Sequence, residues 1–446
     1  MQDSSQPGGA MTRRVFVGGA LVTGAALLAG GLAGCASGGG ATPAGASDSA
    51  SAGGATAGGN ASDNAGVGTN SNSATDNAAS TAAAPADSNT AFSSIYVIKN
   101  TDGTDDGVER LIALMAGNSL DFYRTAGNPE GLIAADDVVL IKVNSQWAER
   151  GGTNTDLLKR VALAVAGHPE GFTGEIVVAD NGQGQYGTGG KGGSLDWPAT
   201  NAADKTQSAL DVVKALKPEM RISGCLWDDF TLNQVAEFAD GDVGDGFVIE
   251  AAARATGVIV SYAKFTTEYG TPVSFKRGVW DAATQSYDSG RLKVINLPVL
   301  KVHGGYQVTG ALKAYMGTTA NQLTSHAAHN SVGNGGMGTQ MANTRVPTLN
   351  IMDMIWVGVA QGPATKYAEA VEADMIAGST DPVALDWWCA KNVLMPMIEA
   401  GGSSSAKQDP DATDAGSFGY WLALAADELR AAGWAANLGD AVKAVL

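Results

Sequence analysis

An almost continuous apolar run at residues 138–143 constrains the fold more than any other part of the sequence. Only Lys142 interrupts it, so both faces of the predicted strand are buried, as in a parallel sheet covered on both sides. A helical pattern begins at Thr155, the expected N-cap residue, and a second apolar strand follows at residues 175–180. Strand, helix and strand at this spacing predict a right-handed parallel unit. We therefore expect an α/β fold with a mainly parallel sheet flanked by helices, in one or two lobes.

The remaining elements follow from the same periodicities. Pro382 at the first position of a helix indicates that Thr380 or Asp381 caps it. Pro298 predicts that its strand bends or lies at an edge. Further strands are expected at residues 95–99, 258–262, 273–275 and 292–301, and further helices at 108–116, 211–216, 309–316 and 418–446.

The N-terminus reads as a processing segment. Arg13 and Arg14 precede a mildly hydrophobic stretch at residues 15–34, which ends in Leu-Ala-Gly before Cys35. Paired arginines before such a stretch are typical of a twin-arginine export signal, which we place at residues 1–34. The ending is typical of a bacterial lipoprotein, in which Cys35 would carry the lipid. A transmembrane helix of similar length is the alternative.

Composition separates a tether from a folded domain. Residues 35–90 consist almost entirely of Ala, Gly, Ser, Thr, Asn and Asp, and cannot bury enough apolar surface to fold. We interpret them as a flexible tether between the lipid and an α/β domain at residues 91–446. The expected location is the extracytoplasmic face of the cell membrane, reached through the twin-arginine export machinery.

Charge and cysteine content exclude several functions. The formal net charge is −17, and no basic stripe is present, which argues against nucleic-acid binding. Three cysteines without a CxxC pair cannot support a ferredoxin-type cluster, a zinc ribbon or a disulfide framework. A formal GxGxxG at residues 182–187 is followed by further glycines and not by a helix, so a surface loop is favoured over a dinucleotide site.

Polar residues at predicted strand ends mark a candidate site. Ligands of α/β proteins bind beyond the carboxyl ends of the strands, and lysine with histidine there favours a carboxylate or phosphate. We assign His303, as general acid/base, with Lys142 and Asp180 to catalysis. Cofactor or ligand binding falls to the remaining residues of the group, Lys313, Asn144 and Lys301. The alternative for Lys142 or Lys301 is an ion pair with an aspartate in the core.

Histidines gather in the same region. Three of the four histidines in the chain, His303, His326 and His329, fall within one short stretch. We assign His329 and His326 as ligands of a divalent transition metal, nickel or zinc, because imidazole suits these ions. Unrelated surface histidines in a loop are the alternative.

The ordered set of motifs resembles the bacterial "domain of unknown function 362" family. The resemblance spans roughly residues 95–397 and implies the fold, whereas the activity of the family is not established. The motifs are Ile141-Lys142-Val143-Asn144, where the family has Lys-Pro-Asn, Thr155-Asp156-Leu157-Leu158, Val178-Ala179-Asp180, Asn296-Leu297-Pro298, Lys301-Val302-His303, Thr309-Gly310-Ala311-Leu312-Lys313 with Met316-Gly317, and Asp381-Pro382-Val383-Ala384-Leu385-Asp386.

The spacing of three of these residues is also similar to that of the nickel-pincer lactate racemases. In those enzymes a catalytic His, a cofactor-bearing Lys and a nickel-binding His follow one another as His303, Lys313 and His329 do here. This similarity implies a pocket for a metal or a cofactor. The second proton-transferring His of the racemases is missing, since Asp180 and Asn181 stand in its place. Racemization is therefore not expected.

Together these features predict a lipid-anchored enzyme, assisted by a metal or cofactor, that acts on a small anion such as a carboxylate. Two alternatives remain at the level of the sequence. A lipoprotein could bind a small anionic solute without chemistry, or the protein could be a structural or assembly factor at the cell surface. The paired arginines weigh against a binding protein, because such proteins usually travel unfolded.

Overall fold

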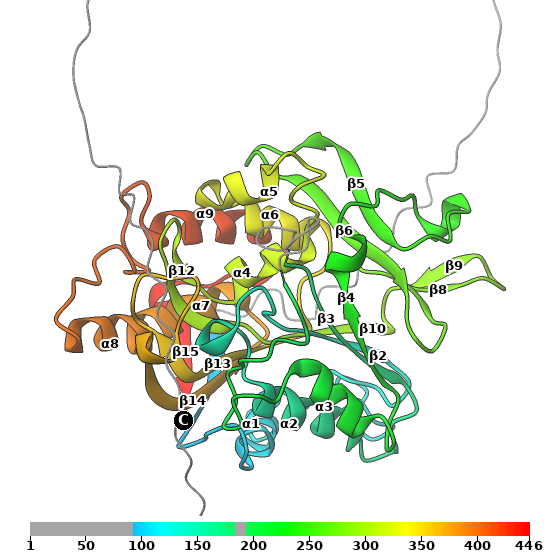
Figure 1. Cartoon of the computed structure of the whole chain (residues 1–446), viewed down its shortest axis with the longest axis horizontal. Coiled ribbons are helices and arrows are strands. Elements are labelled where there is room, and N and C mark those ends of the chain that lie inside the picture. Colours follow the sequence, from blue (N-terminus) through cyan, green and yellow to red (C-terminus); the bar gives the residue numbers. More distant parts are fainter. Residues whose placement is uncertain (1–91, 183–192) are drawn as a thin grey trace, which may run out of the picture. The chain divides into compact units, whose positions relative to one another are not determined.

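The computed structural model describes residues 92–182 and 193–446 and has the expected α/β fold. Its main sheet has ten strands, eight of which follow the order β15-β1-β14-β13-β10-β2-β3-β4 (Figure 1). The run from β13 to β4 is parallel throughout, while β14 pairs antiparallel with both β1 and β13. The prediction of a mainly parallel sheet flanked by helices is confirmed.

The strands of the main sheet are β1 (Ser93–Lys99), β2 (Val138–Lys142), β3 (Glu175–Asp180), β4 (Ile222–Leu226), β10 (Leu292–Asn296), β11 (Val299–His303), β12 (Gln307–Thr309), β13 (Leu349–Gly358), β14 (Ala370–Ser379) and β15 (Val442–Val445). The helices are α1 (Gly107–Ala116), α2 (Thr155–Ala166), α3 (Ala209–Leu216), α4 (Ala311–Ala314), α5 (Ala327–Asn330), α6 (Gly336–Asn343), α7 (Pro382–Cys389), α8 (Met395–Ala400) and α9 (Phe418–Ala431).

Both faces of the main sheet are covered, as the apolar run of β2 requires. Val139 and Ile141 pack with α1, α2 and α3 on one face, whereas Leu140 belongs to the core shared with α4, α6, α7 and α9 on the other (Figure 1). Every residue of β2 and β3 is buried. The centre of the sheet is therefore a rigid base from which strand-end side chains project.

A second, antiparallel sheet is part of the same unit. Its strands are β5 (Gly246–Ala253), β6 (Ile259–Thr266), β7 (Pro272–Ser274), β8 (Gly278–Asp281) and β9 (Ser286–Asp288). Arg345 links the two sheets, because its guanidinium donates to the carbonyl oxygens of Phe275 at 2.9 Å and Leu292 at 3.0 Å. The two sheets share one hydrophobic core, so the described residues form one unit and not two lobes.

The strand predicted at residues 292–301 is broken, which corrects the sequence interpretation. β10 ends at Asn296, and β11 begins at Val299 beside a later part of β13. Pro298 cannot donate a ladder hydrogen bond, but its carbonyl accepts one from the backbone N–H of Asp353 at 2.8 Å. β10 lies between β2 and β13, whereas β11 lies between β13 and β12. The break therefore moves the chain away from the end of β2.

Three helix predictions also need correction. Asn154, and not Thr155, caps α2, since its side chain accepts from the backbone N–H groups of Asp156 and Leu157. The helix expected at 309–316 is the short α4 followed by a 3₁₀ turn at Tyr315–Thr318. The helix expected at 418–446 ends at Ala431, and the chain finishes in strand β15. Asp381 caps α7 as predicted, with Pro382 in the first turn.

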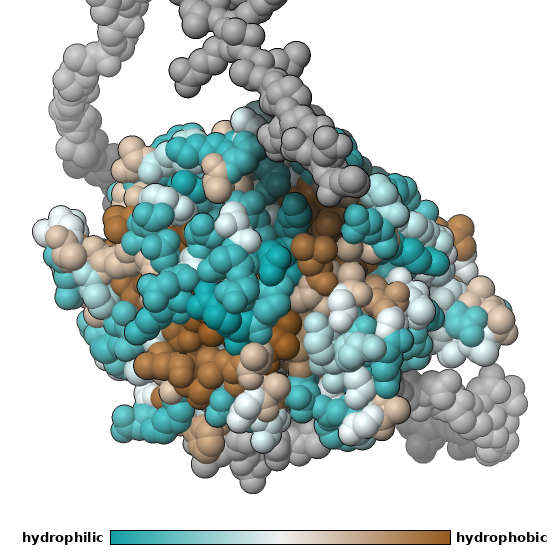
Figure 2. Space-filling model, turned by 90° about the horizontal axis from the view of Figure 1, so that it is seen from below, coloured by the Kyte–Doolittle hydropathy of each residue, from teal (hydrophilic) through white to brown (hydrophobic). Residues whose placement is uncertain are grey.

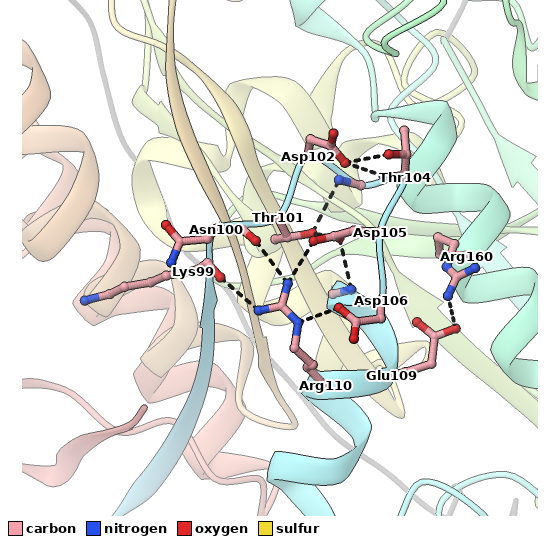
Figure 3. A network of polar contacts seen from close by, with 12 residues as sticks. Lys99, Asn100, Thr101, Asp102, Thr104, Asp105, Asp106, Glu109, Arg110 and Arg160 are labelled. Atoms are coloured by element: carbon pink, nitrogen blue, oxygen red, sulfur yellow. Dashed lines mark hydrogen bonds and ion pairs between the residues drawn. The ribbon is translucent and has the colours of Figure 1, made fainter.

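Figure 3 shows how the turn between β1 and α1 is held. Arg110 on α1 donates to the carbonyl oxygens of Lys99 and Asn100 at 3.0 and 3.1 Å. It also forms ion pairs with Asp105 and Asp106 at 2.9 and 2.8 Å. One side chain thus joins the end of β1 to the start of α1.

On the face seen in Figure 2, hydrophilic residues surround a band of hydrophobic ones. Among the described residues, the large hydrophobic side chains that are exposed come from distant parts of the chain: Phe92, Leu232, Val243, Val371, Tyr420 and Leu446. Single exposed residues of this kind are normal on a protein surface.

Several predictions fall on residues that the structure does not describe. They are the paired Arg13 and Arg14, the lipidation site Cys35, the tether at 35–90, and most of the glycine-rich loop, from Gln183 to Gly192. In the described ranges no helix is long and apolar enough to cross a membrane.

Candidate functional site

A small pocket lies where β2, β3 and β11 end. All six residues assigned from the sequence to catalysis or cofactor binding line it: Lys142, Asn144, Asp180, Lys301, His303 and Lys313. The other lining residues are Gln146, Trp147, Asn181, Thr309, Ala314, Met316, Gly317 and Pro363. The topology explains this gathering, because β2 and β3 are parallel neighbours and their polar ends meet at one edge of the sheet.

The amine of Lys142 is locked by the protein. Its Nζ lies 3.1 Å from Oδ1 of Asp180 and donates to the carbonyl oxygen of Ala314 at 2.5 Å. Oδ2 of Asp180 accepts from the backbone N–H of Ser145 at 2.6 Å and from its hydroxyl at 3.1 Å. The alternative of a buried ion pair therefore describes Lys142 well, although the pair forms a wall of the pocket.

Gly317 is required by this ion pair. A Cβ at this position would lie 2.0 Å from Oδ1 of Asp180 and 2.8 Å from Nζ of Lys142. Any side chain would therefore force the pair apart.

Lys301 is fully buried, and no aspartate among the described residues pairs with it. Its Nζ donates to the carbonyl oxygen of Gly151 at 2.5 Å. Burial lowers the pKa of Lys301 well below its ordinary value, and the nearby charges of Lys313 and Lys142 lower it further. Asp180 opposes this shift only in part. The protonated form of Lys301 is therefore destabilised, and a negative charge in the pocket would stabilise it.

Thr309 lies directly across from Lys301 in the β11–β12 hairpin. Its side chain is buried, and Oγ1 has no hydrogen-bond partner among the described residues. A buried hydroxyl normally has a partner, since an unsatisfied one costs about 1–3 kcal/mol. This orphaned hydroxyl faces the same pocket and suggests that a ligand completes its bonding.

Lys313 reaches the pocket from the short helix α4. Asp386 on α7 holds the start of that helix, because its carboxylate accepts from the backbone N–H groups of Ala311 at 2.5 Å and Leu312 at 3.0 Å. Burial raises the pKa of Asp386 to about 7, against the effect of these hydrogen bonds. A Cβ at Gly310 would lie 2.2 Å from the same carboxylate, so the turn before α4 requires glycine.

The amine of Lys313 differs from those of the other two lysines. It lies 5.6 Å from the centre of the Tyr306 ring, and no acceptor for it is found in the part of the chain that the structure describes. Burial lowers the pKa of Lys313 to about 8, and the charge of Lys142 contributes. A minor fraction of this amine, about a tenth at pH 7, is therefore neutral.

His303 is fixed by two backbone groups. Its Nδ1 accepts from the N–H groups of Gly305 at 3.1 Å and Tyr306 at 3.2 Å. Burial lowers the pKa of His303 to about 2, and the charges of Lys313 and Lys301 add to the effect. The ring is therefore neutral, and its proton is on Nε2. This geometry favours a hydrogen-bond donor, whereas the sequence predicts a general acid/base.

The other two histidines do not line the pocket. The ring of His329 contacts Tyr306, with 5.1 Å between ring centres, and Tyr306 also contacts His303 at 5.5 Å. Burial, with the charge of Lys313, lowers the pKa of His329 to about 4. His326 is exposed, and its Nδ1 is 3.0 Å from Nδ2 of Asn321.

These histidines do not form a recognisable metal site. Across residues 92–182 and 193–446, no three His, Cys, Asp or Glu side chains are placed to hold a metal ion. Nδ1 of His303 is also occupied by its two backbone donors. The predicted nickel or zinc site at His329 and His326 thus gains no support from the geometry. Cys389 is buried in the core, whereas Cys225 is only partly exposed to solvent.

Comparison with known families gives one match. A family model described as "Domain of unknown function (DUF362)" matches residues 242–391. The chain carries a DUF362 domain. Neither a curated protein nor a solved structure matches the chain.

The matched stretch of the DUF362 domain contributes Lys301, His303, Thr309 and Lys313 to the pocket. Lys142, Asn144 and Asp180 come from β2, β3 and the loop after β2, which precede the matched stretch. The pocket is therefore formed by residues within the matched stretch and by residues that precede it in the chain.

Sequence reasoning missed three residues that shape the site. Thr309, Gly317 and Asp386 all lie within the motifs that carry the family resemblance, but they had been given no role. A threonine or a glycine carries no chemical signal by itself. The contacts of these residues are between distant segments, and only the folded chain reveals them.

Proposed function

We propose that the DUF362 domain is an enzyme that binds a small carboxylate-bearing substrate in the strand-end pocket. The observation that carries this proposal is the charge of the site. Three buried lysines, Lys142, Lys301 and Lys313, face one pocket with a single carboxylate, that of Asp180. Keeping all three amines protonated is costly without an anion, because each ammonium group has lost its water.

The residues suggest distinct roles. Lys301 retains N–H groups beyond the one that it gives to Gly151, and with the hydroxyl of Thr309 it would bind the carboxylate. The Nε2–H of His303 would donate to a neighbouring oxygen of the substrate, where it stabilises developing negative charge. The ion pair of Lys142 and Asp180 would hold one wall of the pocket in place. No step of this proposal passes through a metal ion.

A binding protein without chemistry is the second candidate. It is favoured by the fixed amines of Lys142 and Lys301, both of which already donate to backbone carbonyl groups. The feature that favours an enzyme is Lys313, a buried amine without an acceptor among the described residues, next to a neutral histidine.

Proton NMR in D₂O can test the proposal with a panel of small mono- and dicarboxylic acids. An enzyme should remove, shift or exchange signals of at least one acid, and Lys313→Met should abolish the change. Lys293→Met is the matched control, because Lys293 is also buried but lies on β10 outside the pocket. Saturation transfer to an acid without any chemical change would support the binding protein. No interaction with any of the acids would contradict both candidates.

We also propose that the domain works outside the cytoplasm, anchored by a lipid on Cys35 and exported by the twin-arginine machinery. This proposal rests on Arg13, Arg14 and Cys35 in the sequence. Replacing both arginines with lysine should leave precursor in the cytoplasm. Cys35→Ala should abolish incorporation of a labelled fatty acid. Normal delivery or persistent labelling would contradict the respective assignment.

A further inference from the structure

One lysine of the pocket is placed as a nucleophile. Nζ of Lys142 and Nζ of Lys301 donate to carbonyl oxygens at 2.5 Å, which orients each amine toward the protein. Lys313 lines the same pocket, yet its Nζ makes no hydrogen bond or ion pair within the described ranges. Its lone pair, when the amine is neutral, is therefore available to a ligand.

The surroundings keep this amine partly neutral. In the pocket lining that the structure describes, the ammonium group of Lys142 and the carboxylate of Asp180 form an ion pair, and Lys301 adds a second buried amine. The ring of Tyr306, whose centre lies 5.6 Å from Nζ of Lys313, is uncharged, and its hydroxyl donates to the carbonyl oxygen of His329. A desolvated lysine beside other cations loses its proton more easily and becomes nucleophilic.

We propose that Lys313 forms an imine with the carbonyl carbon of a small 2-oxo acid held in this pocket. The inference rests on the proposed carboxylate site and names the class of substrate. The carboxylate of such an acid would lie against Lys301 and Thr309, which places the adjacent carbonyl group toward the remaining amine. An acid of this class is favoured because the pocket offers both an anion site and a free nucleophile.

The chemistry balances without any oxidant or reductant. The neutral Nζ of Lys313 adds to the carbonyl carbon, and a new C–N bond forms as the C–O π bond opens. The two amine hydrogens leave with the carbonyl oxygen as water, and a C=N bond remains. The iminium form takes up one further proton. The Nε2–H of His303 donates to the carbonyl oxygen while negative charge develops there.

Reductive trapping tests this step. The full chain is incubated with pyruvate or 2-oxoglutarate and sodium borohydride, and peptides are then mapped by mass spectrometry. One adduct at Lys313 is the expected result. Lys313→Arg, which keeps the positive charge without a nucleophilic amine, should give only background labelling. Lys214→Arg, at an exposed position of helix α3, is the matched control and should keep the full adduct.

A parallel measurement tests the imine and the carboxylate site separately. Pyruvate and propionate, which has the carboxylate but no carbonyl group, should both raise the thermal unfolding midpoint. If both stabilise the protein but borohydride traps no adduct at Lys313, the imine is wrong and the anion pocket stands. An adduct mainly at Lys301 or spread over surface lysines also overturns the inference. If neither acid stabilises the protein and no adduct forms, the inference fails together with the carboxylate site on which it rests.

Discussion

Replacing the buried Lys313 with methionine should stabilise the protein at neutral pH. Burial lowers the pKa of this amine from 10.5 to about 8. At pH 7 the folded state therefore holds a proton that costs about 3 kcal/mol, since each tenfold change in proton affinity corresponds to about 1.4 kcal/mol. Methionine has a similar length and no charge, so Lys313→Met should recover about 1–3 kcal/mol.

The gain should also depend on pH in a defined direction. The unfolded amine binds its proton up to about pH 10.5, whereas the folded amine releases it near pH 8. The stability of the natural protein therefore rises with pH between these values as the penalty is relieved. From pH 7 to pH 9 the advantage of Lys313→Met should shrink by about 1 kcal/mol.

Urea denaturation followed by tryptophan fluorescence at both pH values measures this difference. Lys142→Met is the contrasting variant. It leaves Asp180 buried without its partner, and should destabilise the protein by about 3–5 kcal/mol. A destabilised Lys313→Met variant, or an equal gain in the free energy of unfolding at pH 7 and pH 9, would show that the buried charge of Lys313 does not destabilise the protein.

Three further changes test the walls of the pocket. Gly317→Ala should destabilise the protein by about 1–3 kcal/mol and weaken binding of carboxylates, because its Cβ would lie 2.0 Å from Asp180; calorimetry measures both. Asp386→Asn should lower the free energy of unfolding by about 1–3 kcal/mol, because one amide hydrogen bond at the start of α4 is lost; urea denaturation would show it. Thr309→Val should leave stability unchanged or slightly raised but weaken carboxylate affinity at least severalfold; unchanged affinity in titration calorimetry would remove Thr309 from the site.

Much of the fold could be predicted because local patterns and tertiary structure agree. Strand β2 is buried on both faces, and helix α2 buries its apolar face, as the sequence indicates. The break at Pro298 was expected only as a bend. Its consequence, a change of neighbouring strand between β10 and β11, depends on β13, which is long enough to pair with both. Such a pairing leaves no trace in the local sequence.

The candidate site could be predicted in composition but not in chemistry. Positions at or just past strand ends were enough to group Lys142, Lys301 and Lys313, because ligands of α/β proteins bind beyond the strand ends. It could not show which amine has an acceptor, since the acceptors are backbone carbonyl groups of Ala314 and Gly151. Backbone groups are the same at every position, so only the folded geometry distinguishes the three lysines.

The pairing of β1 with β15 has a consequence for the timing of folding. β1 precedes all the other described elements, yet both of its neighbours in the sheet, β14 and β15, lie near the other end of the chain, with Ser93 opposite Val442. During synthesis neither edge of β1 can pair with its neighbouring strand until almost every other element has been made. Until then it is an apolar strand with free backbone groups, a state that invites association between chains. We therefore expect the main sheet to be completed only after the ribosome has passed β15, with β1 as its last strand to be enclosed.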